Sequence, residues 1–176
     1  MASTTWNLDT AHSEVTFKVK HLVISSVSGK FKNFSSTVTT EGDDFSTAKI
    51  RFELESGSID TGVEMRDNHL RSDEFFNAET FPKITFIATA IRMVEGNEHE
   101  IDGNLTIRDV TKPITLKVDF GGIATDPYGQ VKAGFELEGK IKRKEFGLSW
   151  NAMTEAGGAV VSDEVKFQAN VQYIKQ

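Results

Sequence analysis

The sequence of 176 residues contains no cysteine and only four histidines. Without cysteine the chain has no disulfide, no thiolate nucleophile and no thiolate metal ligand. His12, His21, His69 and His99 are not spaced as neighbours on one helical turn or as alternate residues of one strand, as paired zinc ligands often are. No metal site is therefore predicted.

Long apolar runs are also absent from the chain. No stretch approaches the roughly 18 apolar residues that a membrane-spanning helix requires, so stable membrane insertion is not expected. Residues 1–14 have neither the basic region nor the apolar region of a secretory signal, which favours a cytoplasmic location.

The formal net charge of −6 leaves the chain with no excess of positive charge. Nucleic-acid binding needs clustered lysine and arginine, and anionic membranes attract the same residues, so neither is predicted as the main partner. The basic residues between Lys140 and Lys144 are interpreted as a solvated strand face.

Apolar and polar residues alternate along most of the chain, which is typical of strands with one wet face. Short turns such as Gly96-Asn97 and residues 126–129 separate these segments. We predict about eight antiparallel strands in one domain, residues 1–176, and their similar lengths favour an extended up-and-down barrel over a Greek-key sandwich. The predicted strands include residues 14–21, 49–55, 83–93, 101–108, 114–120, 131–142 and 165–173.

One long interruption breaks the alternation, and it predicts a helical insertion at about residues 61–78. Apolar residues have helical spacing from Val63 to Leu70, and Ser72 stands where the N-cap of a further turn would lie. So short a helix is marginal alone in water, so we expect it to pack on the barrel.

The inward positions of the predicted strands combine large aromatic residues with small ones. This pattern leaves two interpretations open: a packed core, or a slender apolar tunnel suited to an extended hydrocarbon. The aromatic residues are Phe17, Phe52, Phe86, Phe120, Phe135 and Phe167, and the small ones are Ala88, Ala90, Gly103, Ala133, Gly139 and Ala169.

Candidate catalytic residues are few. Asp9, His12 and Ser13 are the residue types of a catalytic triad, but sequence neighbours rarely achieve triad geometry.

The charged residues of the predicted helix have two readings. Arg66, Asp67 and His69 share the helix, where they either anchor it to the barrel or contact the polar head of a ligand. Arg143 has inward parity, and a buried charge requires a partner, for which Asp67 or Asp60 is suggested.

Four segments, in this order, resemble the YceI-like family of lipocalin-like, polyisoprenoid-binding proteins. They are WNLDTAHSEVTFKVKHLVISSVSGKF, SIDTGVEMRDNHLRSDEFFNAETFPKITF, DGNLTIRDVTKPITL and KRKEFGLSW. The resemblance implies a barrel with an elongated apolar interior that holds a long isoprenoid or similar lipid, and it implies no catalytic residues. Asp109 departs from the family pattern, which usually has glycine in that connection.

We therefore expect a protein that carries or sequesters a long-chain lipid, such as a polyisoprenoid, an isoprenoid quinone or a fatty amide, without catalysis and without another cofactor. The alternatives are a structural or stress-related interaction module with a filled core, and a lipid-modifying enzyme. A homodimer that shields the barrel mouth is compatible with the main reading. The residues expected to contact the lipid chain are Phe17, Val19, His21, Phe31, Phe52, Leu70, Phe75, Phe76, Phe86, Leu105, Phe135, Phe146 and Trp150. Those expected at the head group, or anchoring the helix, are His12, Arg66, Asp67, His69 and Arg143.

Overall fold

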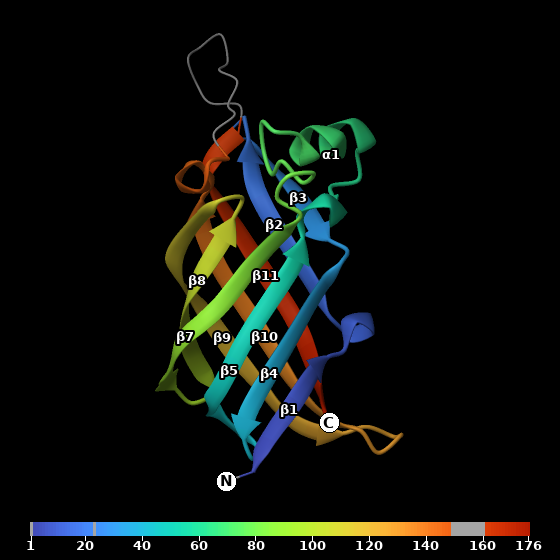
Figure 1. The fold of residues 1–176 in the computed structure, drawn as a ribbon, viewed down its shortest axis with the longest axis vertical. Helices are drawn as coiled ribbons and strands as arrows, with labels where there is room; N and C mark the ends of the chain where they lie inside the picture. The colour runs from blue at the N-terminus through green and yellow to red at the C-terminus, as the bar shows by residue number, and fades with distance from the viewer. Residues whose placement is uncertain (1, 23, 149–160) are drawn as a thin grey trace.

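The computed structural model describes residues 2–22, 24–148 and 161–176, and these form a closed antiparallel barrel of eight strands (Figure 1). This confirms the fold class predicted from the alternation. The ring closes because the N-terminal strand pairs with the C-terminal strand. In pairing order the strands are β1 (Ser3–Leu8), β4 (Phe34–Glu41), β5 (Asp44–Glu55), β7 (Lys83–Glu95), β8 (Glu98–Ile107), β9 (Val110–Thr125), β10 (Val131–Lys142) and β11 (Val161–Lys175).

Three further strands extend the wall at one end of the barrel. β11 is long enough to pair with β1 near its C-terminal end and with β2 (Glu14–His21) over its first part. β2 continues into β3 (Ser25–Phe31), which pairs with the short β6 (Ile59–Asp60). A short 3-10 helix, η1 (Thr10–His12), separates β1 from β2.

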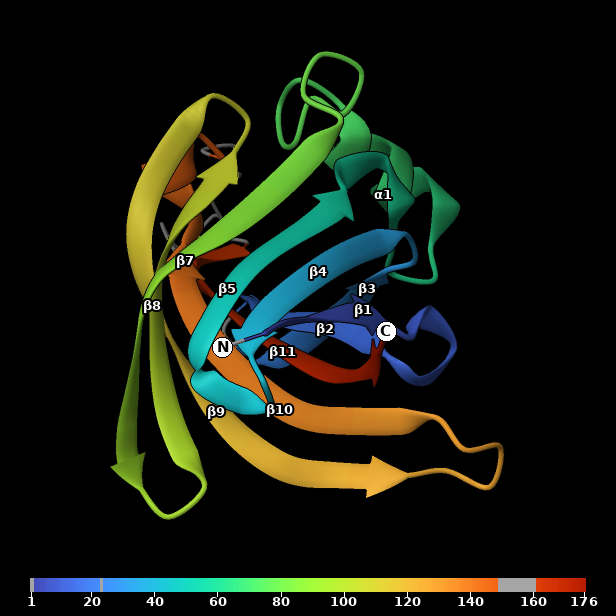
Figure 2. The same ribbon diagram turned by 60° about the horizontal axis from the view of Figure 1, so that its bottom comes forward.

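The helical insertion lies at the end of the barrel that β2 and β3 extend, which we call the upper end (Figure 1). Figure 2 brings the opposite, lower end forward and shows the strands running around a closed ring with α1 outside it. The insertion contains α1 (Glu64–Arg71), and the 3-10 helices η2 (Ser56–Ser58) and η3 (Arg143–Phe146) lie in other connections.

The helix predicted by the spacing from Val63 to Leu70 is confirmed within one residue at each end. The role suggested for Ser72 is wrong. Ser72 is the C-cap of α1, and both its N–H and its Oγ donate to the carbonyl of His69. The segment after it forms turns. A serine hydroxyl can bond backward to a helix carbonyl as readily as it can cap a new helix.

Strand boundaries match best where alternation is cleanest. β2 has the predicted bounds, whereas β1 was not predicted and Pro113 proves to lie inside β9. Pro113 is tolerated because β9 pairs there with β8 alone, since its pairing with β10 begins at Lys117. A β-bulge after Ala88 turns Ala90 outward, so its predicted inward parity is wrong.

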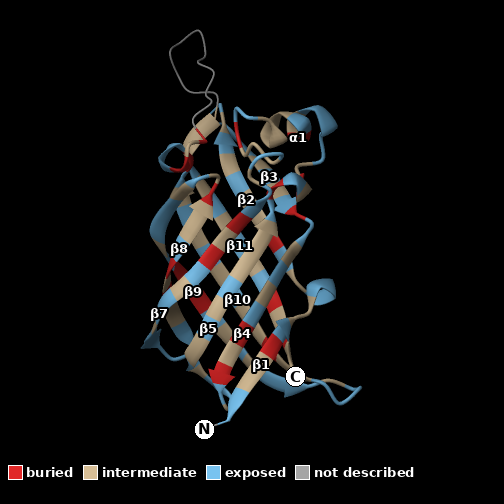
Figure 3. Ribbon diagram, viewed as in Figure 1, coloured by how far each residue is buried: buried red, intermediate tan, exposed pale blue. Residues whose placement is uncertain are grey.

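Five aromatic residues fill the lower end of the barrel, and we call them the aromatic plug: Trp6, Phe45, Phe120, Phe135 and Tyr173. The ring of Phe45 lies 4.9 Å from that of Trp6, 5.5 Å from that of Phe120 and 5.0 Å from that of Phe135 between centroids. Phe135 also stacks on Phe120 and meets Tyr173 edge-on. Figure 3 shows further buried residues along the strands and at the upper end, while α1 is largely exposed or intermediate. The filled-core interpretation therefore describes the lower end.

Candidate functional site

Inward-facing glycines determine how the phenylalanine side chains lie against the barrel wall. Gly139 pairs directly with Phe167, and a Cβ added to this glycine would lie 2.7 Å from the Phe167 ring. The ring therefore occupies the space that a side chain at residue 139 would fill. Phe17 lies over Gly29 and Phe86 over Gly103 in the same way. These three rings lie close to the wall instead of filling the centre of the barrel.

A cavity of about 920 Å³ occupies the upper end of the barrel, and we call it the upper cavity. Its wall comes from β2, β3, β8 and β11, and the insertion lines one side of it. The T-shaped contact of Phe76 with Phe31, at 5.9 Å between centroids, holds the insertion against β3. An apolar cavity of this size lies within the range of roughly 300 to 1,000 Å³ that is usual for small-molecule sites.

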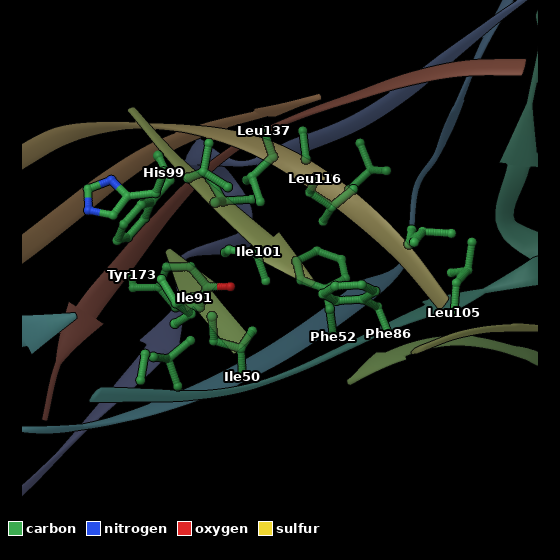
Figure 4. Close-up of a pocket in the computed structure, with 18 of the residues that line it drawn as sticks. Ile50, Phe52, Phe86, Ile91, His99, Ile101, Leu105, Leu116, Leu137 and Tyr173 are labelled. Atoms are coloured by element: carbon green, nitrogen blue, oxygen red, sulfur yellow. The ribbon is translucent and has the colours of Figure 1, made fainter. Parts of the chain in front are cut away.

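A second cavity of about 160 Å³, the lower cavity, lies deeper in the barrel above the aromatic plug. Figure 4 shows its lining side chains, with Ile50, Phe52, Phe86 and Leu116 among them. Figure 4 also shows Tyr173 in this lining, where burial raises the pKa of its hydroxyl to about 12 while a hydrogen bond with Ser36 opposes that shift. Residues that line both cavities are Val15, Leu54, Ile84, Leu105 and Phe167, so the two lie end to end.

Most of the residues selected from the sequence border one of these two cavities. The upper cavity is lined by Phe17, Val19, His21, Phe31, Leu70, Phe75, Phe76, Leu105, Arg66, His69 and Arg143. The lower cavity is lined by Phe52, Phe86, Leu105 and Phe135.

Three selected residues lie elsewhere, and a fourth is outside the described residues. Phe146 is 1% exposed and packs in the core next to the upper cavity without lining it. Asp67 is buried at the base of α1. His12 lies in η1, where its side chain is 59% exposed and bonded to Asp9. Trp150 falls in the segment 149–160 that the structure does not describe.

The triad residue types near the N-terminus do not form a triad. Nδ1 of His12 lies 2.7 Å from Oδ2 of Asp9, but Oγ of Ser13 donates to the carbonyl of Asp9 and accepts the N–H of Gln172. The serine hydroxyl is therefore held by backbone groups and does not face the imidazole.

Polar side chains of the insertion gather at the mouth of the upper cavity around Thr61. Oδ1 of Asp67 accepts from the N–H and the hydroxyl of Thr61, at 2.9 and 2.5 Å. Arg66 donates from Nε to Oγ1 of Thr61 and from Nη2 to its carbonyl, at 2.7 and 2.8 Å. Asp67 and Arg66 thus fix the loop before α1, while His69 pairs with Glu74 within the same insertion.

Anchoring of the insertion to the barrel comes from two arginines that sequence reasoning did not select. Arg71 donates to the carbonyls of Gly57 and Ile59 at 2.8 and 3.1 Å. Arg108, on the turn between β8 and β9, donates to the carbonyl of Phe75 at 3.1 Å. Both bond to backbone oxygens of other segments, a pairing that residue type and spacing do not encode.

Arg143 is buried, as its inward parity predicted, but it has partners other than those suggested. Its guanidinium donates to the carbonyls of Leu148, Ser162 and Val161, at 2.6, 2.9 and 3.1 Å. The carboxylates suggested from the sequence are bonded elsewhere, Asp60 to Lys32 and Asp67 to Thr61. Burial lowers the pKa of the Arg143 guanidinium, and the charge of Asp163 counteracts this shift.

Lining residues that were not selected from the sequence come from the strands, as Ile107 and Val161 do, and from the insertion. Thr61, Met65, Ser72 and Glu74 border the upper cavity alongside Arg66 and His69. Their place in the same charged segment was the only signal available. Among the described residues, no group of three or more His, Asp or Glu side chains could hold a metal ion, and no described helix is long and apolar enough to cross a membrane.

Comparison with known proteins gives a consistent result. The model of the YceI-like domain matches residues 6–173. A protein named YceI from Salmonella newport is 42% identical over 165 residues, which cover 94% of this chain and 83% of the relative. The crystal structure of a YceI protein from Campylobacter jejuni is 34% identical, with a TM-score of 0.76 and 96% of each chain covered. A polyisoprenoid-binding domain from Saccharophagus degradans has a TM-score of 0.74 over 97% of this chain and 98% of that domain, and at 16% identity it shows the fold alone. The chain therefore belongs to the family defined by the YceI-like domain.

Proposed function

We propose that this protein binds a long-chain apolar lipid, a polyisoprenoid or a similar chain, in the upper cavity and without catalysis. The observation that carries the proposal is the upper cavity itself, which encloses about 920 Å³ behind an apolar wall. Its polar lining is concentrated in the insertion at the mouth. This division suits an amphipathic molecule with a hydrocarbon tail inside and a polar head at the mouth.

The tail supplies most of the expected affinity. Each buried CH₂ contributes about 0.8 kcal/mol, so a five-carbon isoprene unit contributes roughly 3 to 4 kcal/mol before costs. Association itself costs on the order of 4 to 15 kcal/mol, so several buried units are needed for useful affinity. Small polar metabolites cannot gain this energy from the same wall.

An isoprenoid is the first ligand class to test. The domain from Saccharophagus degradans is described as polyisoprenoid-binding, and it shares the barrel fold of this chain. Isoprenoid quinones and fatty amides have comparable tails and differ mainly in the head group, so they form the natural comparison set.

Arg66 is the candidate for contact with the head group. Its Nε and Nη2 bond to Thr61, and within the described residues Nη1 has no hydrogen-bond partner. The side chain lines the upper cavity and is half-buried. A head group with an oxygen acceptor, such as a hydroxyl, a carbonyl or an amide oxygen, would complete the hydrogen bonding of this guanidinium.

Native mass spectrometry of protein purified without detergent tests the proposal. We expect a lipid-sized adduct, or uptake of added polyprenol, in the wild-type protein. Val27 lines the upper cavity, so Val27→Trp should narrow it and reduce uptake, whereas Ser26→Trp on the outer face of β3 should retain uptake. Absence of any adduct and of any uptake of polyprenol, quinone or fatty amide would contradict the proposed function.

A further inference from the structure

Three lysines lie directly opposite one another on the outer face of neighbouring strands. Lys140 of β10 pairs in register with Lys166 of β11, and Lys166 pairs with Lys18 of β2. Each of these lysines is next in sequence to an inward-facing residue, namely Gly139, Phe167 or Phe17. Because side chains alternate between the two faces of a strand, the three lysines face solvent. We call Lys18, Lys140 and Lys166 the lysine row.

More lysines continue the positive surface toward the upper end. Lys20 follows on β2, Lys142 follows on β10, and Lys30 lies on β3, all of them exposed. The acidic residues on the outer face of these strands are Glu14, Glu136, Glu138 and Glu164, and Glu164 lies opposite Lys142, so the six lysines are still in excess. A net charge of −6 for the whole chain therefore coexists with a positive wall formed by β10, β11, β2 and β3.

Ion pairs do not offset the repulsion between the charges of the lysine row. Within the described residues, no ion pair joins Lys18, Lys140 or Lys166 to a carboxylate, although Lys32, Lys83, Lys132 and Lys175 all have such partners. Like charges placed directly opposite across strands destabilise a sheet. An external anionic partner would relieve this repulsion.

Apolar side chains project from the same end of the barrel. In the turn between β2 and β3, which begins two residues after Lys20, Leu22 is 40% exposed and Ile24 is 84% exposed. Leu22 also has a φ of 55°, a region that branched side chains rarely adopt. On the insertion, Met65 is 83% exposed and lines the upper cavity.

Exposed apolar residues at the lower end have a different electrostatic setting. Met93 and Val94 are exposed near the end of β7, but Glu95 follows them and Glu98 lies opposite Glu95 on β8. The apolar tip at Leu22 instead follows Lys20, at the upper end of the barrel, where Figure 1 places β2, β3 and α1. The combination of apolar tips and lysines matches the interface of an anionic bilayer, whose surface attracts lysine and whose interior accepts apolar side chains.

We propose that the upper end docks reversibly on an anionic lipid bilayer, with Leu22 and Ile24 entering the interface and the lysine row contacting lipid phosphates. This inference rests on the proposed function, because docking places the mouth of the upper cavity where a lipid can enter or leave it. The net charge alone predicted that an anionic membrane is not a main partner. Net charge, however, averages over a surface on which positive and negative residues are segregated.

Co-sedimentation with vesicles tests this docking. Vesicles of phosphatidylcholine containing about one-third phosphatidylglycerol should bind the wild-type protein, and pure phosphatidylcholine should bind it much less. Each lysine at an anionic surface contributes a factor of about five in affinity, so K18Q/K140Q/K166Q should weaken binding by roughly a hundredfold. L22S/I24S should also weaken it.

A matched control variant distinguishes an effect of this surface from an effect of the total charge of the protein. K49Q/K112Q/K117Q removes the same charge from exposed lysines of β5 and β9 and should bind as the wild type does. The proposal is overturned if both triple variants lose binding equally, if lipid charge has no effect, or if a DNA duplex binds as tightly as vesicles and L22S/I24S changes nothing.

Polyprenol uptake measured in parallel, without vesicles, keeps the two proposals separate. K18Q/K140Q/K166Q should take up polyprenol as the wild type does, because no residue of the lysine row lines a cavity. Uptake without vesicle binding would contradict the docking and leave the proposed function in place. Vesicle binding without uptake would support the docking surface and contradict the lipid cavity.

Discussion

At the scale of single residues, Gly139 shows how the absence of a side chain opens the barrel interior. A Cβ at this position would lie 2.7 Å from Cζ of Phe167 and 2.8 Å from Cδ2 of Leu116. We predict that G139A destabilises the protein by about 1 to 3 kcal/mol, because the methyl group overpacks a filled site, and that it pushes the Phe167 ring inward. Urea unfolding measures the first effect and polyprenol uptake the second.

Gly134 provides the matched control in the same strand. A Cβ there would meet nothing within 4 Å, and its φ is not positive. G134A should therefore be neutral or stabilise the protein by about 0.4 to 1 kcal/mol, because alanine restricts the unfolded chain. Equal losses in the two variants would show that Gly139 is not set apart by its contact with Phe167.

Asp9 should make part of the stability depend on pH. Burial alone would raise its pKa, but hydrogen bonds from His12 and Lys132 outweigh this effect and lower the pKa below 3.8. A carboxyl whose pKa is lower in the folded state contributes stability above pH 3.8, and this contribution is lost as the pH falls through the lowered value.

We expect D9N to lower the thermal midpoint at neutral pH and to reduce the loss of stability on acidification. Thermal unfolding at neutral pH and below pH 3.8 measures both effects, with D119N on the exposed face of β9 as the control. If acidification destabilises D9N as much as the wild type, the Asp9 pairing does not contribute to the pH dependence.

At the scale of elements, the helical insertion depends on a few bonds to the barrel. Arg108 donates through Nη1 to the carbonyl of Phe75, and through the same nitrogen to that of Gly147 at 3.2 Å. We predict that R108A destabilises the protein by about 1.5 to 3 kcal/mol and increases amide exchange across residues 72–78.

Exchange of bound lipid should also be faster in R108A, because the insertion lines the upper cavity. R51A is a suitable control, since it removes an exposed ion pair with Glu53 that is worth at most about 1 kcal/mol. Unchanged amide exchange in residues 72–78 of R108A would contradict the anchoring role.

The elements differ in how far the sequence could predict them. β2 was predicted with its bounds because Val15, Phe17 and Val19 alternate cleanly with polar residues. β1 was missed because only two large apolar residues, Trp6 and Leu8, mark its inner face, and their burial exists only once β4 and β11 flank the strand.

The site was predictable to the extent that strand parity decides which side chains face inward. Parity places Phe17 and Phe31 at the upper cavity. It says nothing about Thr61 or Glu74, whose positions depend on how the insertion folds back over the barrel. Arg143 shows a related limit, because its inward parity was right but its backbone partners depend on tertiary structure.

At the scale of the whole molecule, the aromatic plug limits how much of the barrel a ligand can occupy. Phe45 lies at its centre, in contact with Trp6, Phe120 and Phe135. We predict that F45A destabilises the protein by about 3 to 5 kcal/mol and enlarges the lower cavity.

If ligand tails reach the lower cavity, F45A should also shift the preferred polyprenol to a greater length. Native mass spectrometry with a series of chain lengths measures this shift. L70A, which shortens a side chain of the upper cavity, is the control and should change affinity without extending the preferred length. An unchanged preference in F45A would confine the tail to the upper cavity.

Because the aromatic plug fills the lower end, we expect a ligand to enter and leave through the mouth of the upper cavity. A lipid bound as we propose would then leave through the opening by which it entered, with its head group first. An occupied barrel then cannot accept a newcomer until it has emptied, so the rate of exchange should be set by release and should not rise with the concentration of the incoming molecule.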